Sequence, residues 1–393
     1  MRIAHVITRL IVGGAQENTL ASVLGLRKIP QVEVRLVSGP THGPEGTLEP
    51  IARAQPGLFL LVPELVRPVH PWKDWIAFRK LTGFFRDFRP DLVHTHSGKA
   101  GVLGRLAARK ARVPRIVHTI HGPSFGPFQG AIANSLFKLA ERKAGRVTDH
   151  FVVVAEAMRD QYLEAGIGAP HQYTRIFSGF DLNPFLAAQN DLELRAQIGI
   201  SPGDFVIGKI ARLFKLKGHD DLFAAARSLV EQVPQAKFLL IGNGPWREKF
   251  ESRAAELNMR DRFVFTGLVP PAEVPRLVGV MDVLVHLSLR EGLARALPQA
   301  LAAGRPVVAY DCDGAREVCL PEKTGFLIQP GDISGLVRSV ARLACDPALR
   351  RALGEQGREM VRRNFPVEKM VNDLFELYQA LLQTAPKTPA PAT

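Results

Sequence analysis

Cysteine is nearly absent from this sequence: three occur among 393 residues, and all three lie beyond residue 311. So few and so widely spaced cysteines can form neither a disulfide framework nor a zinc cluster. Long apolar runs are absent too, because no stretch reaches the roughly 20 residues that cross a bilayer as a helix. The first predicted strand begins at once, with Ile3–Ile7, and leaves no room for a signal peptide. We therefore expect a cytoplasmic protein in a reducing compartment.

Acidic residues are scarce in the first half of the chain. Residues 1–180 hold 24 Lys and Arg against 13 Asp and Glu, whereas residues 181–393 hold 27 against 25. No acidic residue occurs from Leu92 to Ala140, although seven basic ones do. A single arginine is most simply a solvated side chain, but the whole asymmetry predicts an anionic partner for the first half.

A segment rich in aromatic and basic residues precedes this acid-free run. Residues 71–90 interleave six aromatic with five basic side chains, and Trp72, Trp75 and Arg79 share helical spacing. A helix of this kind either packs its aromatic residues against a sheet or lies in the surface of an anionic membrane. We expect the packed arrangement, with one edge facing the membrane.

Short apolar runs followed by helical patterns recur along the chain, which indicates an α/β protein, and 393 residues suffice for two domains. The stretch Glu291–Ala309 carries the most specific pattern. The run Met281–Ser288 before it predicts a strand, Gly304 ends a predicted helix, and Pro306–Ala309 begins the next strand. The apolar positions of that helix are Leu293, Leu297, Ala300 and Leu301. In such a strand–helix–strand step, ligands bind at the carboxyl end of the strand.

The residues from Glu291 to Ala309 resemble the signature of the retaining GT-B glycosyltransferases of family four, which carry two glutamates eight positions apart. Glu291 fills the first position, and Gln299 stands where the second glutamate is expected. Eight residues are about two helical turns, so both side chains are expected on one helix face. The resemblance implies that Glu291, with Gly292 and Leu293 beside it, contacts the transferred sugar. It implies that Gln299 binds the ribose diol of the nucleotide without a charge.

A second part of the resemblance lies in the strand Phe205–Ala211 and the residues after it. Arg212 and Lys217 follow this strand five positions apart, as in the family, and both can bind a pyrophosphate and neutralise it as it leaves. Lys215 is the weaker neighbour. Gly267 ends another predicted strand, where the family holds the nucleotide base through backbone groups.

The first half supplies further candidates. Gly13 and Gly14 follow the first strand at the start of a helical run and can bring a ligand close to the backbone. Two histidine pairs end the next predicted strands: His94 with His96, and His118 with His121. Metal binding is one reading of these pairs, and hydrogen bonding at strand ends is the one we favour.

The resemblance gives His121 the place of a histidine that contacts the transferred sugar. His96, and Arg105 in the basic helix that follows, are the candidates for acceptor binding. No metal or other cofactor is expected, because the Asp-x-Asp of Asp311 and Asp313 lies in a glycine turn that the resemblance explains without a metal.

The resemblance implies two Rossmann-like domains that face each other across a cleft. We predict an acceptor-binding domain over residues 1–185, a donor-binding domain over 186–365, a helix over 366–383 that crosses back to the first domain, and a disordered tail over 384–393. The implied activity is transfer of a sugar, with retained anomeric configuration, from a nucleotide-sugar to a glycan or lipid-linked acceptor. Nucleic acid is not an expected partner, whereas an anionic membrane surface is.

Two alternatives stay open. A nucleotide-sugar epimerase of the same fold uses the same phosphate-binding residues. A binding protein that has lost catalysis is compatible with the glutamine at position 299.

Overall fold

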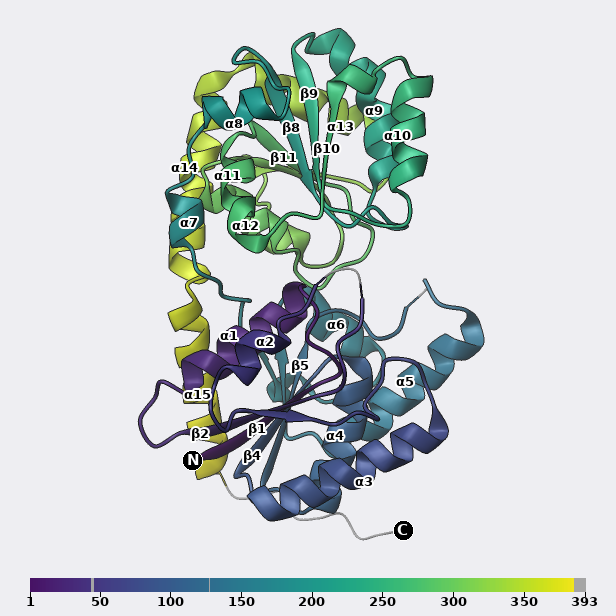
Figure 1. The fold of residues 1–393 in the computed structure, drawn as a ribbon, viewed down its shortest axis with the longest axis vertical. Coiled ribbons are helices and arrows are strands. Elements are labelled where there is room, and N and C mark those ends of the chain that lie inside the picture. Colours follow the sequence, from purple (N-terminus) through teal and green to yellow (C-terminus); the bar gives the residue numbers. More distant parts are fainter. Residues whose placement is uncertain (44–45, 127, 385–393) are drawn as a thin grey trace. The chain divides into compact units, whose positions relative to one another are not determined.

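The structure, a computed structural model, describes residues 1–43, 46–126 and 128–384 (Figure 1). The chain forms two compact units. The first comprises Met1–Phe180 and the C-terminal segment from Val367, and the second comprises Asp181–Pro366. The predicted domain limits at 185 and 365 lie within a few residues of these boundaries. Of the predicted tail, residues 385–393 lie outside the described part of the chain.

The first unit is built on a parallel sheet of seven strands in the order β3-β2-β1-β4-β5-β6-β7. Its strands are β1 (Arg2–Ile7), β2 (Glu33–Ser38), β3 (Phe59–Leu61), β4 (Leu92–His96), β5 (Arg115–Ile120), β6 (His150–Val153) and β7 (Tyr173–Arg175). Nearly every residue of the central strands is buried, the histidines and threonines of β4 and β5 included, because helices cover both faces of a parallel sheet. The chain reverses its direction of sheet growth between β1 and β4. The carboxyl ends of strands at such a switch point are where open α/β sheets usually bind ligands.

Helices cover both faces of this sheet. They are α1 (Gly14–Leu26), α2 (Glu49–Arg53), α3 (Pro71–Phe88), α4 (Gly98–Lys110), α5 (Ala131–Gly145), α6 (Glu156–Glu164) and the C-terminal α15 (Val367–Gln383). On one face α15 packs beside α1 (Figure 1). Met370, Leu374 and Tyr378 of α15 enter the core there. On the other face α3 and α4 pack together, with Leu81 and Phe85 in the core.

The second unit contains a parallel sheet of six strands in the order β10-β9-β8-β11-β12-β13. Its strands are β8 (Phe205–Ile210), β9 (Ala236–Ile241), β10 (Phe263–Gly267), β11 (Val283–His286), β12 (Val307–Tyr310) and β13 (Gly325–Ile328). Its helices are α7 (Asn183–Leu186), α8 (Leu192–Gln197), α9 (His219–Gln232), α10 (Arg247–Glu256), α11 (Val274–Gly279), α12 (Ala296–Ala302), α13 (Ile333–Cys345) and α14 (Pro347–Asn364). Here the sheet reverses its growth between β8 and β11.

The predicted α/β class is confirmed, with two Rossmann-like units and a last helix that returns to the first unit. No helix in the described part of the chain is long and apolar enough to cross a membrane.

Candidate active site

The loops that follow β8 and β11 bring Lys217 and Glu291 together at the carboxyl edge of the second sheet. The Lys217 ammonium donates a hydrogen bond to Glu291 Oε1, and both side chains are partly exposed. A backbone bond from Leu289 N to Leu216 O, 2.9 Å long, ties the two loops. Gly218 has a φ of +65°, and a Cβ there would lie 2.0 Å from Leu287 O, so only glycine allows this approach. The predicted association of Lys217 with Glu291 at one strand edge is therefore present in the structure.

Asp313 holds the backbone of Glu291 in place. Its carboxylate accepts a hydrogen bond from the Glu291 N–H at 2.7 Å, and Gly314 N donates to Gly292 O at 3.0 Å. Asp313 is part of the Asp-x-Asp that the sequence reading set aside as incidental. Its side chain has a structural task that the sequence pattern did not reveal.

The predicted helix after Gly292 begins later than expected. Helix α12 spans Ala296–Ala302, so Glu291 lies in a loop ahead of it, and the prediction that Glu291 and Gln299 share a helix face is wrong. The physical reason is that the backbone of Glu291 and Gly292 bonds to the 313–314 turn, which competes with helical hydrogen bonds. The predicted end is correct, because Gly304 has the positive φ of a C-terminal glycine.

The other candidates of the second unit lie on the loop that holds Lys217, on or just before α12, and at the end of β10. Arg212 is exposed on the same loop as Lys217, with its guanidinium 5.5 Å from the Phe214 ring centroid. Leu293 is buried, Gln299 is partly buried on α12, and Gly267 ends β10 with a φ of +74°. Gly267 O accepts a bond from Gly242 N, so the ends of β9 and β10 are joined.

In the first unit, Gly13 and Gly14 lie at the start of α1, beyond the carboxyl end of β1. Gly13 is the N-cap in an extended conformation and makes no side-chain cap, and Gly14 is exposed. A loop of six residues, 8–13, connects β1 to the first N–H groups of this 13-residue helix. This is the arrangement that the glycine pair predicts, a loop and a helix start beyond the carboxyl end of the first strand.

His121 lies just beyond β5 at the same edge of the first sheet. It is partly buried, and burial lowers its pKa to about 4, so its imidazole is neutral at pH 7. His96, which ends β4, is only 1% exposed, and its Nδ1 lies 3.1 Å from His121 Nε2. Direct contact of His96 with an acceptor is therefore not supported, because His96 is buried and bonded to His121.

Arg105, the other candidate for acceptor binding, lies inside the first unit. Its side chain is fully buried, and its guanidinium pairs with Glu141 at 2.5 Å and donates to Gly101 O at 2.7 Å. Ser124 also donates to the Glu141 carboxylate, at 3.0 Å. The sequence reading treated Arg105 as part of an acid-free surface, but Glu141, just past that run, folds back from α5 to neutralise it.

His94 and His118 have structural roles, as expected. His94 bonds to the Tyr378 hydroxyl on α15 and to Thr119, and His118 bonds to Thr95 at 2.9 Å. His5, His94 and His96 offer ring nitrogens that all lie within 4.8 Å of one another, a spacing that could hold a metal ion. However, both ring nitrogens of His94 and of His96 already have hydrogen-bond partners. We therefore interpret the three histidines as a hydrogen-bonded cluster and not as a metal site.

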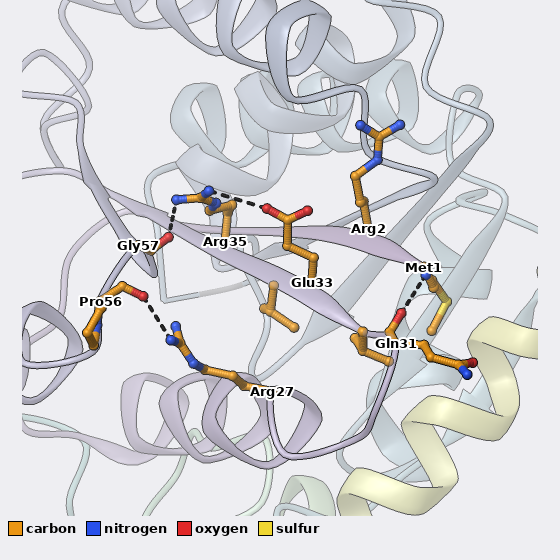
Figure 2. A pocket seen from close by; sticks show the side chains of 10 residues that line it. Met1, Arg2, Arg27, Gln31, Glu33, Arg35, Pro56 and Gly57 are labelled. Carbon is orange, nitrogen blue, oxygen red and sulfur yellow. Dashed lines mark hydrogen bonds and ion pairs between the residues drawn. The ribbon is translucent and has the colours of Figure 1, made fainter.

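A cavity of about 570 Å³ in the first unit lies elsewhere. It opens at the amino ends of β1 and β2, the sheet edge opposite the histidines (Figure 2). Arg35 pairs with Glu33, Arg27 donates to Pro56 O, and the Met1 ammonium donates to Gln31 O (Figure 2). Its polar groups bond mainly to one another, and it contains none of the predicted site residues.

Comparison with known proteins identifies the family. The model described as "Glycosyltransferase Family 4" matches residues 12–183, and the model described as "Glycosyl transferases group 1" matches residues 190–360. The chain belongs to the family four glycosyltransferases. The resemblance seen in the sequence is thereby confirmed, and the two matches cover one structural unit each.

Relatives of this glycosyltransferase act on different acceptors. It is 27% identical over 382 residues to an Escherichia coli UDP-Gal:alpha-D-GlcNAc-diphosphoundecaprenol alpha-1,3-galactosyltransferase, covering 96% of each chain. It is 30% identical over 308 residues to the 2-deoxystreptamine glucosyltransferase of Streptomyces kanamyceticus, covering 76% of this chain and 79% of that one. Among solved structures it resembles Anabaena HepE in complex with UDP and glucose, with a TM-score of 0.82, 22% identity, and coverage of 97% and 100%.

The sequence reading of this glycosyltransferase missed Lys209. This residue of β8 is 1% exposed, and its Nζ makes no hydrogen bond within the described residues. Burial, and then the charge of Lys217, lower its pKa to about 7, against the opposing effects of Asp221 and Glu291. The sequence did carry a signal for Lys209, because it is the one charged residue in the run Phe205–Ile210.

Proposed function

We propose that this protein is a retaining glycosyltransferase that moves a sugar from a UDP-sugar to a lipid-linked or cell-envelope glycan acceptor. The observation that carries the proposal is the Lys217–Glu291 pair, with Arg212 on the same loop, at the switch point of the second sheet. We propose a UDP-sugar donor because the structural neighbour Anabaena HepE was solved with UDP and with UDP-glucose. We propose a lipid-linked acceptor because the name of the Escherichia coli relative gives a diphosphoundecaprenol-linked substrate.

In this proposal the second unit binds the donor. Arg212 and Lys217 bind the diphosphate and stabilise the charge that develops on it as the bond to the sugar breaks. Glu291 accepts hydrogen bonds from the sugar hydroxyls, and Gln299 bonds to the ribose diol. No metal is assigned a role, since these cationic side chains supply the charge that the leaving group needs.

The first unit contributes His121, which bonds to the transferred sugar. The bond from the anomeric carbon to the phosphate oxygen breaks, and the acceptor oxygen bonds to the same face of that carbon. The acceptor proton passes to the departing phosphate oxygen, so neither a side-chain nucleophile nor a side-chain base is required. The sugar therefore keeps its anomeric configuration.

Acceptor delivery at an anionic membrane is supported by exposed apolar side chains on the first unit. On α5, Ile132 is 80% exposed, Leu136 61% and Leu139 62%, and their spacing places them along one helix face. Arg142 and Lys143 follow on the same helix and are exposed. This combination of apolar and basic residues is typical of a helix that lies in a membrane surface.

The first turns of α3 expose two indole rings, also on the first unit. Trp72 and Trp75 are 65% and 47% exposed and stack with their centroids 5.1 Å apart, whereas Leu81 and Phe85 of the same helix are buried. The predicted packing against the sheet is thus present at Leu81 and Phe85, and the exposed indoles support the proposal that the other end of α3 meets a membrane. Arg105, one of the seven basic residues between Leu92 and Ala140, is buried and takes no part in membrane binding.

The proposal is tested by measuring whether UDP-, GDP- or ADP-sugars raise the melting temperature of the purified protein. A ligand that binds only the folded state raises the stability of that state. A stabilising donor is then incubated with and without a polyprenyl-diphosphate-linked sugar. Transfer requires the acceptor. Inversion of a sugar centre without the acceptor would indicate an epimerase, and binding without turnover would indicate a binding protein.

A further inference from the structure

Three imidazoles form a hydrogen-bonded row across the middle of the first sheet. His5 lies on β1, His96 ends β4 and His121 follows β5, and these three strands are neighbours in the sheet. His5 Nδ1 lies 2.9 Å from His96 Nε2, and His96 Nδ1 lies 3.1 Å from His121 Nε2. The rings stack with centroid separations of 5.2 and 5.3 Å. The row thus starts inside the protein and ends at the proposed sugar-binding residue.

Each of the three imidazoles is neutral. His5 and His96 are 0% and 1% exposed, and His121 is partly buried. Burial lowers the pKa of His5 to about 3 and that of His121 to about 4, and it lowers the pKa of His96 well below the usual value. A neutral imidazole carries one N–H donor and one acceptor nitrogen, so each ring has a single proton to place.

This proton count couples the three tautomers. If His96 carries its proton on Nδ1, it donates to His121 and accepts from His5. If it carries the proton on Nε2, it donates to His5 and accepts from His121. Both hydrogen bonds form only when all three rings follow the same direction. The row therefore has two complete states, and they differ in whether His121 Nδ1 carries a proton or a lone pair.

The buried end of the row favours one direction. His5 Nε2 has no hydrogen-bond partner within the described residues. In one direction this atom would be an N–H donor buried without an acceptor, which is rare in folded proteins, and in the other it is a bare acceptor nitrogen. The favoured direction runs from His5 Nδ1–H to His96 and from His96 Nδ1–H to His121. His121 then accepts at Nε2 and carries its own proton on Nδ1.

We propose that His5 and His96 are positioning residues that fix His121 as the Nδ1–H tautomer, so that it meets the transferred sugar as a hydrogen-bond donor. The inference rests on the proposed function for its catalytic consequence, but the tautomer itself is independent of any reaction. A ring with Nε2 occupied and Nδ1 protonated has no free lone pair, so His121 does not act as a base. This agrees with a mechanism in which the departing phosphate takes the acceptor proton.

The direct test is a long-range proton–nitrogen correlation spectrum of the protein labelled with ¹⁵N-histidine. His121 is assigned from the spectrum of a His121→Gln variant. We expect protonated Nδ1 and bare Nε2 for His5, His96 and His121 at pH 7.5. A His121 that carries its proton on Nε2 would overturn the inference. Retention of one equivalent of added Zn²⁺ with loss of the His5 and His96 N–H signals would also overturn it, in favour of a metal site.

Two variants of His96 separate positioning from structure. His96→Leu removes both hydrogen bonds, and we expect mixed tautomers for His121 and a loss of kcat of about ten- to a hundred-fold, the usual range for residues that orient a reacting group. The KM for the donor should change less than kcat. His96→Asn keeps an N–H donor near the Nδ1 position, and we expect it to retain the His121 tautomer and most of kcat. Equal losses in the two variants would contradict a positioning role.

If His96→Leu fails to fold, His5→Asn serves instead, because its amide keeps an N–H donor near the Nδ1 position, toward His96, and should preserve the tautomer. A change of the His121 tautomer in a folded His5→Asn protein would contradict the inference. A further outcome separates the tautomer from catalysis. If the parent protein shows the expected tautomer but His121→Ala keeps full transfer activity, His121 has no role in the reaction. The catalytic part of the inference is then wrong.

Discussion

Lys217 and Glu291, 74 positions apart in the sequence, form an ion pair between the loops that follow β8 and β11. Because both side chains are partly exposed, the pair contributes little to stability. It does keep an ammonium and a carboxylate at the switch point of the sheet before a ligand arrives. A donor diphosphate that binds Lys217 would free the Glu291 carboxylate for the sugar hydroxyls.

Removing either cationic side chain of this loop should weaken diphosphate binding. A hydrogen bond to a charged group is worth about 1.5–3 kcal/mol, so Lys217→Ala and Arg212→Ala should each raise the Kd for UDP by about ten- to a hundred-fold. Lys215→Ala, which removes an exposed lysine from the same loop, is the matched control and should stay within about twofold of the parent. Titration calorimetry measures all three. Unchanged affinity in both test variants would remove the diphosphate assignment.

The buried pair of Arg105 and Glu141 should be required for folding and not for donor binding. Arg105→Met leaves Glu141 as a buried charge without its partner, which typically costs 3–5 kcal/mol of unfolding free energy. The double variant Arg105→Met, Glu141→Leu should recover much of that loss, because replacing both partners by apolar residues is often neutral. Arg109→Met, an exposed control on the same helix, should change stability by less than about 0.5 kcal/mol.

Urea unfolding monitored by circular dichroism gives these values. If the double variant lost as much unfolding free energy as Arg105→Met, the ion pair itself would provide the stability. The uncompensated charge of Glu141 would then not explain the loss. UDP affinity should be the same in every variant of this set that folds, because Arg105 belongs to the first unit and the proposed donor-binding loops belong to the second.

The buried histidines of the first sheet should make the fold sensitive to acid. Folding lowers the pKa of His5 to about 3 and of His121 to about 4, and lowers those of His94, His96 and His118 well below the usual value, chiefly by burial. Between about pH 6.5 and 4 the unfolded chain binds protons that the folded chain does not, so stability falls as the pH falls. Each such group adds up to about 1.4 kcal/mol per pH unit to this slope.

Urea unfolding at a series of pH values tests this dependence. Stability should be highest above pH 6.5 and should decline steeply from pH 6.5 to 4.5. His171→Gln, which changes an exposed histidine, should leave the slope as it is, and a folded His118→Gln variant should flatten it. A free energy of unfolding that stays constant over this range would show that these histidines are not held neutral by the fold.

Membrane binding should depend on the exposed face of α5. The triple variant Ile132→Ser, Leu136→Ser, Leu139→Ser should lose sedimentation with anionic vesicles, while UDP affinity stays the same. Leu192→Ser, which removes an exposed leucine from the second unit, is the control. High salt should weaken the binding of the parent protein, because screening reduces the attraction of basic residues to the leaflet. Sedimentation of the triple variant equal to that of the parent would exclude α5 as the membrane contact.

The sequence predicted best the features that depend on local pattern. The apolar runs at Ile3–Ile7 and Phe205–Ile210 are buried strands because a parallel sheet covered on both faces needs continuous apolar residues. Gly304 ended its helix as predicted, because the positive φ needed there favours glycine. The edge strand Tyr173–Arg175 was not predicted, since its side chains are not buried and carry no apolar pattern.

Features that depend on contacts between distant segments escaped prediction. Nothing in the spacing shows that Glu141 neutralises Arg105, or that Asp313 holds the Glu291 loop out of the helix. The row formed by His5, His96 and His121 arises only once β1, β4 and β5 are known to be neighbours. The sequence therefore identified the residues at the strand ends, while the strand order determines how they work together.

The most direct test of retaining sugar transfer is the anomeric configuration of the product. The purified protein is incubated with an α-linked UDP-sugar and a polyprenyl-diphosphate-linked acceptor, and the new glycosidic linkage is assigned by proton NMR, with UDP release measured in parallel. The expected result is an α-linked product formed together with one equivalent of UDP, and its loss in Lys217→Ala. A β-linked product would contradict the retaining mechanism, and no UDP release with any donor that binds would contradict glycosyl transfer itself.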